Sequence, residues 1–333
     1  MPQKIAPPVD FVYIECMKTA VKGIVIAVCS VAVIAVIGLA AASSYFFTFA
    51  LDPASDKDVF TDDEPAVLIA EDESAAALPA EEWLMSEGEN VFITAKDGLQ
   101  LHGYFIAAKV PSDRYALAVH GYKMSAAAMA QYARHYYERG WNVLVPDQRS
   151  HGLSEGRYIG MGAPERYDMI EWIRYLTEKD SAARVVLHGV SMGAATVMLT
   201  TGEPLPANVR AAVEDCGYSS IDAEFTYQLK QSFNLPRFPL IPVTSLVTKL
   251  RAGYFFGEGD CVRAVGRSVT PTLFIHGDAD TFVPFAMLDQ VYEAASCEKE
   301  KLVVPGAAHA DSVDDAPDLY WAAVDSFLSK YVP

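Results

Sequence analysis

One serine of the chain lies between two glycines in a setting that could make it a nucleophile. It is Ser191, in the run GVSMG over residues 189–193. A strand is predicted over residues 184–187 before it, and a helix over 192–200 after it. The glycines permit a turn too tight for side chains, and the turn would lift the hydroxyl to the helix N-terminus, where backbone N–H groups face developing negative charge. The pattern therefore predicts attack by a serine oxygen on a carbonyl group.

A serine hydroxyl is a poor nucleophile until a base removes its proton, so two further groups are expected later in the chain. His309 is the predicted base, because it lies in a loop just after a predicted strand over residues 301–304. Asp280, in a loop after another predicted strand, is the predicted acid that would orient the imidazole. Asp278 is the alternative acid, although an Asp in such a turn can instead fix its own loop through backbone N–H groups.

The oxyanion of a tetrahedral intermediate needs two N–H donors. The expected donors are the backbone N–H of Met192, which follows the serine, and that of Tyr122, which follows a predicted strand over 115–119. Three histidines end predicted strands in the same way and are expected to serve packing and loop bonding: His120, His188 and His276. No histidine or cysteine spacing suits a metal, and no cofactor is expected.

A second polar loop, over residues 147–156, follows a predicted strand over 142–145. Asp147 with Arg149 or His151 could suggest acid–base chemistry. The favoured interpretation is a loop braced by charge-assisted hydrogen bonds.

The elements that must position these residues alternate between strand and helix after residue 90. A hairpin is predicted first, with strands over 91–94 and 99–105 and a turn at 96–98. The remaining predicted strands cover 115–119, 142–145, 184–187, 209–214, 272–275 and 301–304, and helices cover 126–139, 165–176, 192–200, 286–294 and 319–328. This alternation predicts an α/β fold with a mostly parallel sheet covered on both faces. The apolar, proline-rich stretch 217–268 interrupts the alternation and is expected to form a cap over the site rather than an ordinary pair of packing helices.

Before this domain, residues 23–51 contain no charged residue and are long enough to cross a bilayer as a helix. Lys4, Lys18 and Lys22 precede the run, so residues 1–22 are expected in the cytoplasm and the rest outside. A cleaved signal peptide is the alternative, given the small residues at 40–43. The aromatic residues that follow are interpreted as a belt at the membrane interface: Tyr45, Phe46, Phe47 and Phe49.

Residues 52–89 are acidic and are expected to form a solvated linker, within which a short helix near residues 78–86 could dock through Trp83. The formal net charge of the whole chain is −17, which argues against a nucleic acid partner. The five cysteines are expected to be reduced thiols, although a disulfide among the last three stays open.

Together these motifs resemble the α/β-hydrolase superfamily from residue 90 to the C-terminus. The resemblance rests on the His120-Gly121 strand end, the 147–156 loop, the 189–193 turn, the HGDAD run over 276–280 and the GAAH run over 306–309. More narrowly, the sequence resembles bacterial membrane-anchored hydrolases related to the serine aminopeptidase S33-like and BEM46-like groups. The resemblance implies an α/β-hydrolase fold and a triad of Ser191, Asp280 and His309.

The expected activity is hydrolysis of a carboxylic ester by a membrane-anchored enzyme of the carboxylesterase or lipase type. Its partners would be an acyl ester or a peptide as substrate, and the membrane. A serine peptidase or a thioesterase would use the same triad, and a peptidase would add a charged anchor, for which Glu224, Lys230 and Arg251 are candidates. A binding module without activity is the remaining alternative, because a fold does not fix a function.

Overall fold

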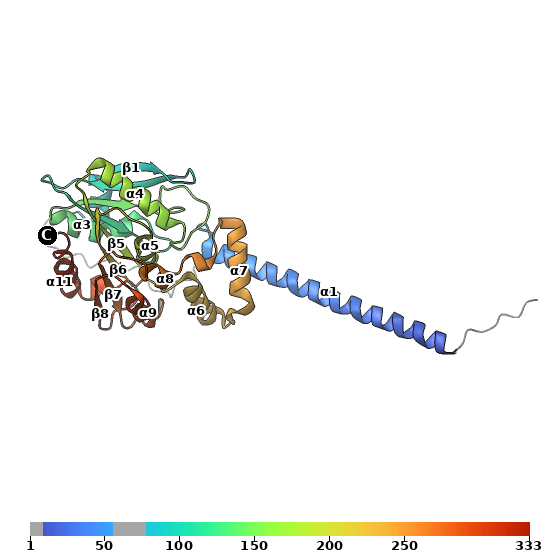
Figure 1. The fold of residues 1–333 in the computed structure, drawn as a ribbon. Coiled ribbons are helices and arrows are strands. Elements are labelled where there is room, and N and C mark those ends of the chain that lie inside the picture. Colours follow the sequence, from blue (N-terminus) through green and yellow to red (C-terminus); the bar gives the residue numbers. More distant parts are fainter. Residues whose placement is uncertain (1–8, 56–77) are drawn as a thin grey trace, which may run out of the picture.

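A single eight-stranded sheet organises the computed structural model, which describes residues 9–55 and 78–333. The spatial order of its strands is β1-β2-β4-β3-β5-β6-β7-β8 (Figure 1). The strands are β1 Glu89–Thr94, β2 Gln100–Ile106, β3 Arg114–Val119, β4 Asn142–Pro146, β5 Arg184–Val190, β6 Val209–Asp215, β7 Thr272–Gly277 and β8 Lys299–Val304. β1 and β2 form the antiparallel edge, and β4 onward in this order runs parallel. The predicted hairpin and mostly parallel sheet are confirmed.

Helices cover both faces of the sheet because successive side chains of each central strand point to opposite faces. In β3, Ala116 and Ala118 join the core beneath α3 (Ala130–Glu138) and α11 (Pro317–Leu328). Their neighbours on the same strand pack toward α4 (Glu165–Lys179) and α5 (Met192–Thr201). A short 3-10 helix η1 (Ala126–Met129) precedes α3, and α10 (Ser312–Asp315) precedes α11.

The interrupting stretch 217–268 contains two long helices, α6 (Ile221–Phe233) and α7 (Arg237–Ala252), which pack on each other. The 3-10 helix η2 (Phe256–Glu258) and the short helix α8 (Cys261–Val265) follow. α8 packs on α5 and on α9 (Ala286–Ala294), so the end of the stretch belongs to the layer over the sheet. The first part, α6 and α7, lies outside that layer, and we refer to these two as the cap helices.

The N-terminal helix α1 (Val9–Leu51) projects as one rod from the end of the domain that carries α7 (Figure 1). Among the described residues, it is the one helix long and apolar enough to cross a membrane, judged by length and composition. Its last turns do not continue the exposed rod. Ser43, Phe47 and Leu51, spaced four residues apart, are fully buried, and α1 packs here against α7.

This packing changes the interpretation of the predicted aromatic belt. Phe47 lies inside the protein, and the rings of Phe46 and Phe49 lie 5.1 and 5.4 Å from that of Phe233 in α6. Tyr45 remains exposed. The last nine of residues 23–51, which were predicted to form a transmembrane helix, therefore pack partly against the folded domain.

The predicted linker 52–89 is also shorter than expected. Helix α2 (Ala80–Glu87) forms its end and docks as anticipated, with Leu84 buried and the Trp83 ring 5.2 Å from that of Tyr137. Residues 56–77, which include Asp56, Lys57 and Asp58, lie outside the described residues, as does Lys4.

The buried end of α1 should contribute to the stability of the domain that contains the sheet. We expect Phe47→Ala to lower the free energy of unfolding by about 3–5 kcal/mol, because a large buried ring is replaced by a cavity. Ile37→Ala, at a position of the same helix that is 63 % exposed, is the matched control and should change it little. Thermal unfolding of the full chain in detergent measures both, and equal unfolding midpoints for the two variants would contradict this assignment.

Candidate active site

Ser191 occupies a strained turn between β5 and α5. Its φ is 57° and its ψ −119°, in the left-handed half of backbone space that non-glycine residues rarely adopt. A Cβ on Gly189 would lie 2.2 Å from the carbonyl oxygen of Gly193, and a Cβ on Gly193 would lie 2.0 Å from that of Val119. Both glycines are therefore required by the space around the turn, as the sequence predicted.

The loops after β7 and β8 bring Asp280 and His309 to this serine. His309 Nε2 lies 2.8 Å from Ser191 Oγ, and His309 Nδ1 lies 2.7 Å from Asp280 Oδ2. Because a carboxylate only accepts hydrogen bonds, Nδ1 carries the proton and Nε2 is left to accept from the serine hydroxyl. Ser191 and His309 are partly exposed whereas Asp280 is buried, so a substrate can reach the serine but not the acid.

Asp280 is held as a carboxylate by the groups around it. Its second oxygen, Oδ1, accepts the backbone N–H groups of Phe282 and Val283 at 2.8 and 2.9 Å. His276 Nε2 lies 3.0 Å from Oδ2. Burial alone would raise the pKa of Asp280, but hydrogen bonds from His276 and His309 outweigh it and hold the pKa at about 2.

His276 was expected to serve packing and loop bonding, and its Nε2 does lie 3.0 Å from the carbonyl oxygen of Val283 in the acid loop. Its contact with the acid itself was missed. It arises because His276 lies near the end of β7, four residues before Asp280, on the strand that carries the acid loop. The HGDAD run was a usable signal, but nothing in the sequence shows that the loop folds back over the end of its own strand.

Asp278, the alternative acid, has a different partner. Its Oδ1 accepts the backbone N–H of Gly306 at 2.6 Å, which ties the acid loop to the loop that carries His309. The structure thus brings Asp280, and not Asp278, to the imidazole.

The two expected oxyanion donors flank the serine. Met192 is the first residue of α5, where backbone N–H groups have no acceptor within the helix. On the other side, a Cβ on Gly121 would lie 3.5 Å from Ser191 Cβ, so the segment leading to Tyr122 runs directly beside the nucleophile.

The segment 120–126 is fixed by the polar loop 147–156. Four hydrogen bonds of 2.6–3.1 Å join them: Gln148 N to His120 Nε2, Gln148 Nε2 to His120 O, Lys123 N to His151 Nε2, and Ala126 N to Asp147 Oδ1. Arg149 makes a bidentate ion pair with Asp168 of α4, at 2.6 and 2.7 Å. These contacts match the predicted braced loop and leave no role for it in acid–base chemistry at Ser191.

His120 and His188 have structural partners, as expected. His120 Nδ1 donates to the carbonyl of Gly121, and His188 lies between the hydroxyls of Tyr136 and Tyr320, each 2.9 Å away. Burial lowers the pKa of both imidazoles to about 3, so each is neutral at ordinary pH.

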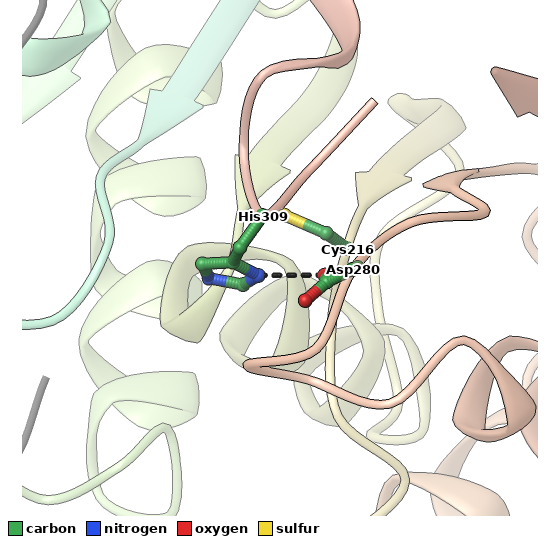
Figure 2. A group of neighbouring side chains, drawn as sticks. All are labelled: Cys216, Asp280 and His309. Atoms are coloured by element: carbon green, nitrogen blue, oxygen red, sulfur yellow. Dashed lines mark hydrogen bonds and ion pairs between the residues drawn. The ribbon is translucent and has the colours of Figure 1, made fainter. Parts of the chain in front are cut away.

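Cys216, at the end of β6, lies behind the Asp280–His309 pair (Figure 2). Its sulfur and one ligand atom of each of these residues lie within 4.8 Å of one another, the one such group found among the described residues. Burial, and then the nearby Asp215 and Asp280, raise the pKa of the Cys216 thiol well above its usual value. The other cysteines with described side chains, Cys29, Cys261 and Cys297, are also free.

Comparison with known proteins gives relatives across most of the domain. Residues 111–224, which include Ser191, match the family described as serine aminopeptidase, S33. The uncharacterized protein YqkD of Bacillus subtilis is 29% identical over 236 residues, covering 70% of this chain and 76% of YqkD. The uncharacterized protein YfhR of Escherichia coli K12 is 28% identical over 254 residues, covering 74% of this chain and 82% of YfhR.

The fold has close counterparts among solved structures. The Pyrococcus furiosus esterase Pf2001 aligns with a TM-score of 0.62 at 23% identity, over 78% of this chain and 97% of that protein. At this identity the likeness concerns the fold. Taken with the family match and the order of strands around the serine turn, it shows that the chain has the α/β-hydrolase fold.

Proposed function

We propose that the protein is a membrane-anchored serine hydrolase that cleaves carboxylic esters through an acyl-enzyme. One observation carries the proposal: the hydrogen-bonded series from Ser191 Oγ through His309 to Asp280, which ends on a serine in a strained and partly exposed turn. A nucleophile, a base and a group that orients the base are what acyl transfer requires. The α/β-hydrolase fold and the match to the S33 serine aminopeptidase family support the same reaction class.

The reaction would proceed in two halves. As Ser191 Oγ attacks the ester carbonyl, its proton passes to His309 Nε2, and the N–H groups of Tyr122 and Met192 hold the oxyanion. The C–O bond then breaks, the proton on His309 moves to the departing alkoxide, and the acyl group stays on Ser191. Water repeats the attack with His309 as base and releases the carboxylic acid.

Asp280 would remain a carboxylate throughout this cycle. With a pKa of about 2 it carries its negative charge at any pH above about 4. It can therefore stabilise the imidazolium that forms at each attack, without accepting the proton itself.

The surroundings of the site favour an ester over a peptide. Of the candidate anchors for a peptide terminus, Arg251 donates to Ser44 Oγ of α1, and Lys230 donates to Asn234 on its own helix. Glu224 is buried, and burial raises its pKa to about 8, so it is mostly neutral at pH 7 and a weak partner for an ammonium group. The family match to a serine aminopeptidase keeps peptide hydrolysis as the second candidate.

The anchor would be α1, with residues 1–22 in the cytoplasm and the domain on the other face of the membrane. Lys18 and Lys22 precede the apolar run, whereas Asp52 follows it, which is the charge pattern of that orientation.

Removal of the nucleophile tests the assignment. We expect Ser191→Ala to lower kcat for p-nitrophenyl butyrate by ~10⁴-fold or more and to abolish labelling by a fluorophosphonate probe. Ser181→Ala, at an exposed serine just before the same strand, is the control and should keep full activity. Full activity in Ser191→Ala would refute the serine mechanism, and a folded wild-type chain that never reacts with the probe would favour a binding module.

The two aspartates of the acid loop provide a matched comparison. Asp280→Asn should lower kcat by about 10³–10⁴-fold, because the amide no longer favours the productive tautomer of His309. Asp278→Asn weakens the contact with Gly306 but leaves Asp280 hydrogen-bonded to His309, so kcat should fall by no more than about tenfold. Steady-state kinetics on the ester distinguishes them, and equal losses would mean that the loop acts only as a structural unit.

The orientation of the anchor is tested on intact cells. A protease added from outside should digest the catalytic domain, because the proposed topology exposes every residue after α1. The cytoplasmic N-terminus, followed through an epitope tag, should stay protected until the cells are lysed. Complete protection of the catalytic domain would reverse the topology.

A further inference from the structure

An apolar pocket lies between the end of α1 and the cap helices α6 and α7. α1 contributes five of its thirteen lining residues: Phe46, Phe47, Phe49, Ala50 and Leu51. Most of the others come from α6 and α7, and only Gln228 and Thr244 of the whole lining are polar. A lining of this kind binds hydrocarbon and offers little to a sugar or a charged group.

The pocket lies just beyond the part of α1 that is long enough to cross the hydrocarbon core of a bilayer. Residues 24–42 come after Lys22, the last charged residue before the apolar run. They come before Ser43, the first described residue of α1 that is buried. These 19 residues span about 28 Å as a helix, which matches a hydrocarbon core of ~30 Å. The pocket wall begins at Phe46, about one helical turn beyond that core.

The cap presents further apolar surface on the same side. Arg251 at the end of α7 donates to Ser44 Oγ at 2.7 Å, which fixes this end of α7 beside the point where α1 enters the domain. On the same helix Leu246 and Leu250 are 49 % and 78 % exposed. Exposed leucines beside a membrane-spanning helix suit contact with lipid more than contact with water.

Two contacts link the pocket to the catalytic residues. Tyr122, the expected oxyanion donor, donates its hydroxyl hydrogen to the carbonyl of Ala50 at 2.6 Å. On the other side, Gln228 Nε2 donates to the carbonyl of Phe282 at 2.9 Å, and the Phe282 ring lies 4.5 Å from the imidazole of His309. Residues that line the pocket therefore touch the immediate neighbours of both the oxyanion segment and the base.

We propose that this pocket receives the acyl chain of an ester lipid drawn from the adjacent bilayer leaflet, with the ester carbonyl at Ser191. The inference rests on the proposed ester hydrolysis and extends it to a substrate class. The geometry identifies a lipid chain as the ligand of the pocket. Helix α1 forms one wall of the pocket and continues into the bilayer, so lipid is the apolar material next to the pocket. Water would be added across the acyl C–O bond, giving a long-chain carboxylic acid and the remaining alcohol of the lipid.

In this arrangement the end of α1 is part of the substrate site as well as an anchor. The chain length of the acyl group, rather than the alcohol, is then the property that the pocket selects.

The experiment narrows the pocket in the full chain, reconstituted in nanodiscs of ether-linked phosphatidylcholine that the enzyme cannot hydrolyse. The probes are p-nitrophenyl acetate, whose two-carbon acyl group would be too short to fill the pocket, and p-nitrophenyl palmitate. Leu240→Trp fills the pocket from α7, and Leu319→Trp, at an exposed leucine of α11 away from the pocket, is the control. Leu240→Trp should lower kcat/KM for the palmitate about tenfold or more, while the value for the acetate stays within about twofold. Leu319→Trp should change neither.

Equal effects of Leu240→Trp on both esters, or none on the palmitate, would overturn the acyl pocket while leaving ester hydrolysis intact. A wild-type chain that cleaves neither ester and is not labelled by a fluorophosphonate would instead refute the proposed function itself. Should Leu240→Trp fail to fold, Phe233→Ala is the second variant. It removes a ring at a half-buried position of the pocket wall and should lower the palmitate-to-acetate ratio of kcat/KM, and an unchanged ratio would overturn the proposal.

Discussion

The backbone of Ser191 is the constraint around which the domain is organised. A left-handed residue between a buried strand and a buried helix costs on the order of 1–3 kcal/mol and persists only where its surroundings determine it. Here β5 is paired on both sides, by β3 and β6, and Ser191 N donates to the carbonyl of Asp215 at 2.8 Å. The strained residue therefore follows a strand that is hydrogen-bonded on both sides. The strained backbone exposes the Ser191 hydroxyl at the edge where the carboxyl ends of the parallel strands meet. The loops after β7 and β8 reach this edge and place Asp280 and His309 beside it.

The segment 120–123 connects this catalytic edge with the helix that leaves the domain. From one side it is held by the loop 147–156. From the other it is held by the end of α1, through Tyr122 Oη to Ala50 O, and by the residues just after α1, through Lys123 Nζ to Ser55 O. Preorganised N–H groups act well only if their direction is fixed before the reaction. A change in how α1 packs against the cap helices would therefore shift Tyr122, the proposed oxyanion donor, although α1 itself contributes no reacting group.

Most of the fold was predictable because its signals are local. Apolar runs such as 115–119 and the turn glycines at 189 and 193 fix strand positions to within a few residues, and chain order then assigns Asp280 and His309 to one edge. The last turns of α1 were not predictable in this way. Lipid and a protein interior select the same side chains, so the sequence of Phe46 to Leu51 suits both, and only the three-dimensional contacts show that Phe47 is buried in the domain. The contact of His276 with Asp280 was missed for a related reason, since it depends on how a loop folds over a strand end.

The pocket and the catalytic residues share their supports, and this bears on how the protein could discriminate among substrates. Gln228 lines the pocket and holds the carbonyl of Phe282, whose ring lies against His309, while Phe282 N also donates to Asp280. An acyl chain that fills the pocket would contact both α6 and α1. Of these, α6 supports the base His309 through Phe282, and α1 supports the oxyanion segment through Tyr122. A short ester would bind without contacting either helix. Binding energy from the remote part of a long substrate would then be available to align the reacting groups, which is how such energy raises kcat rather than only lowering KM. The membrane helix would contribute to that alignment through Ala50, so that anchoring and selectivity arise from the same packing of α1 against the cap.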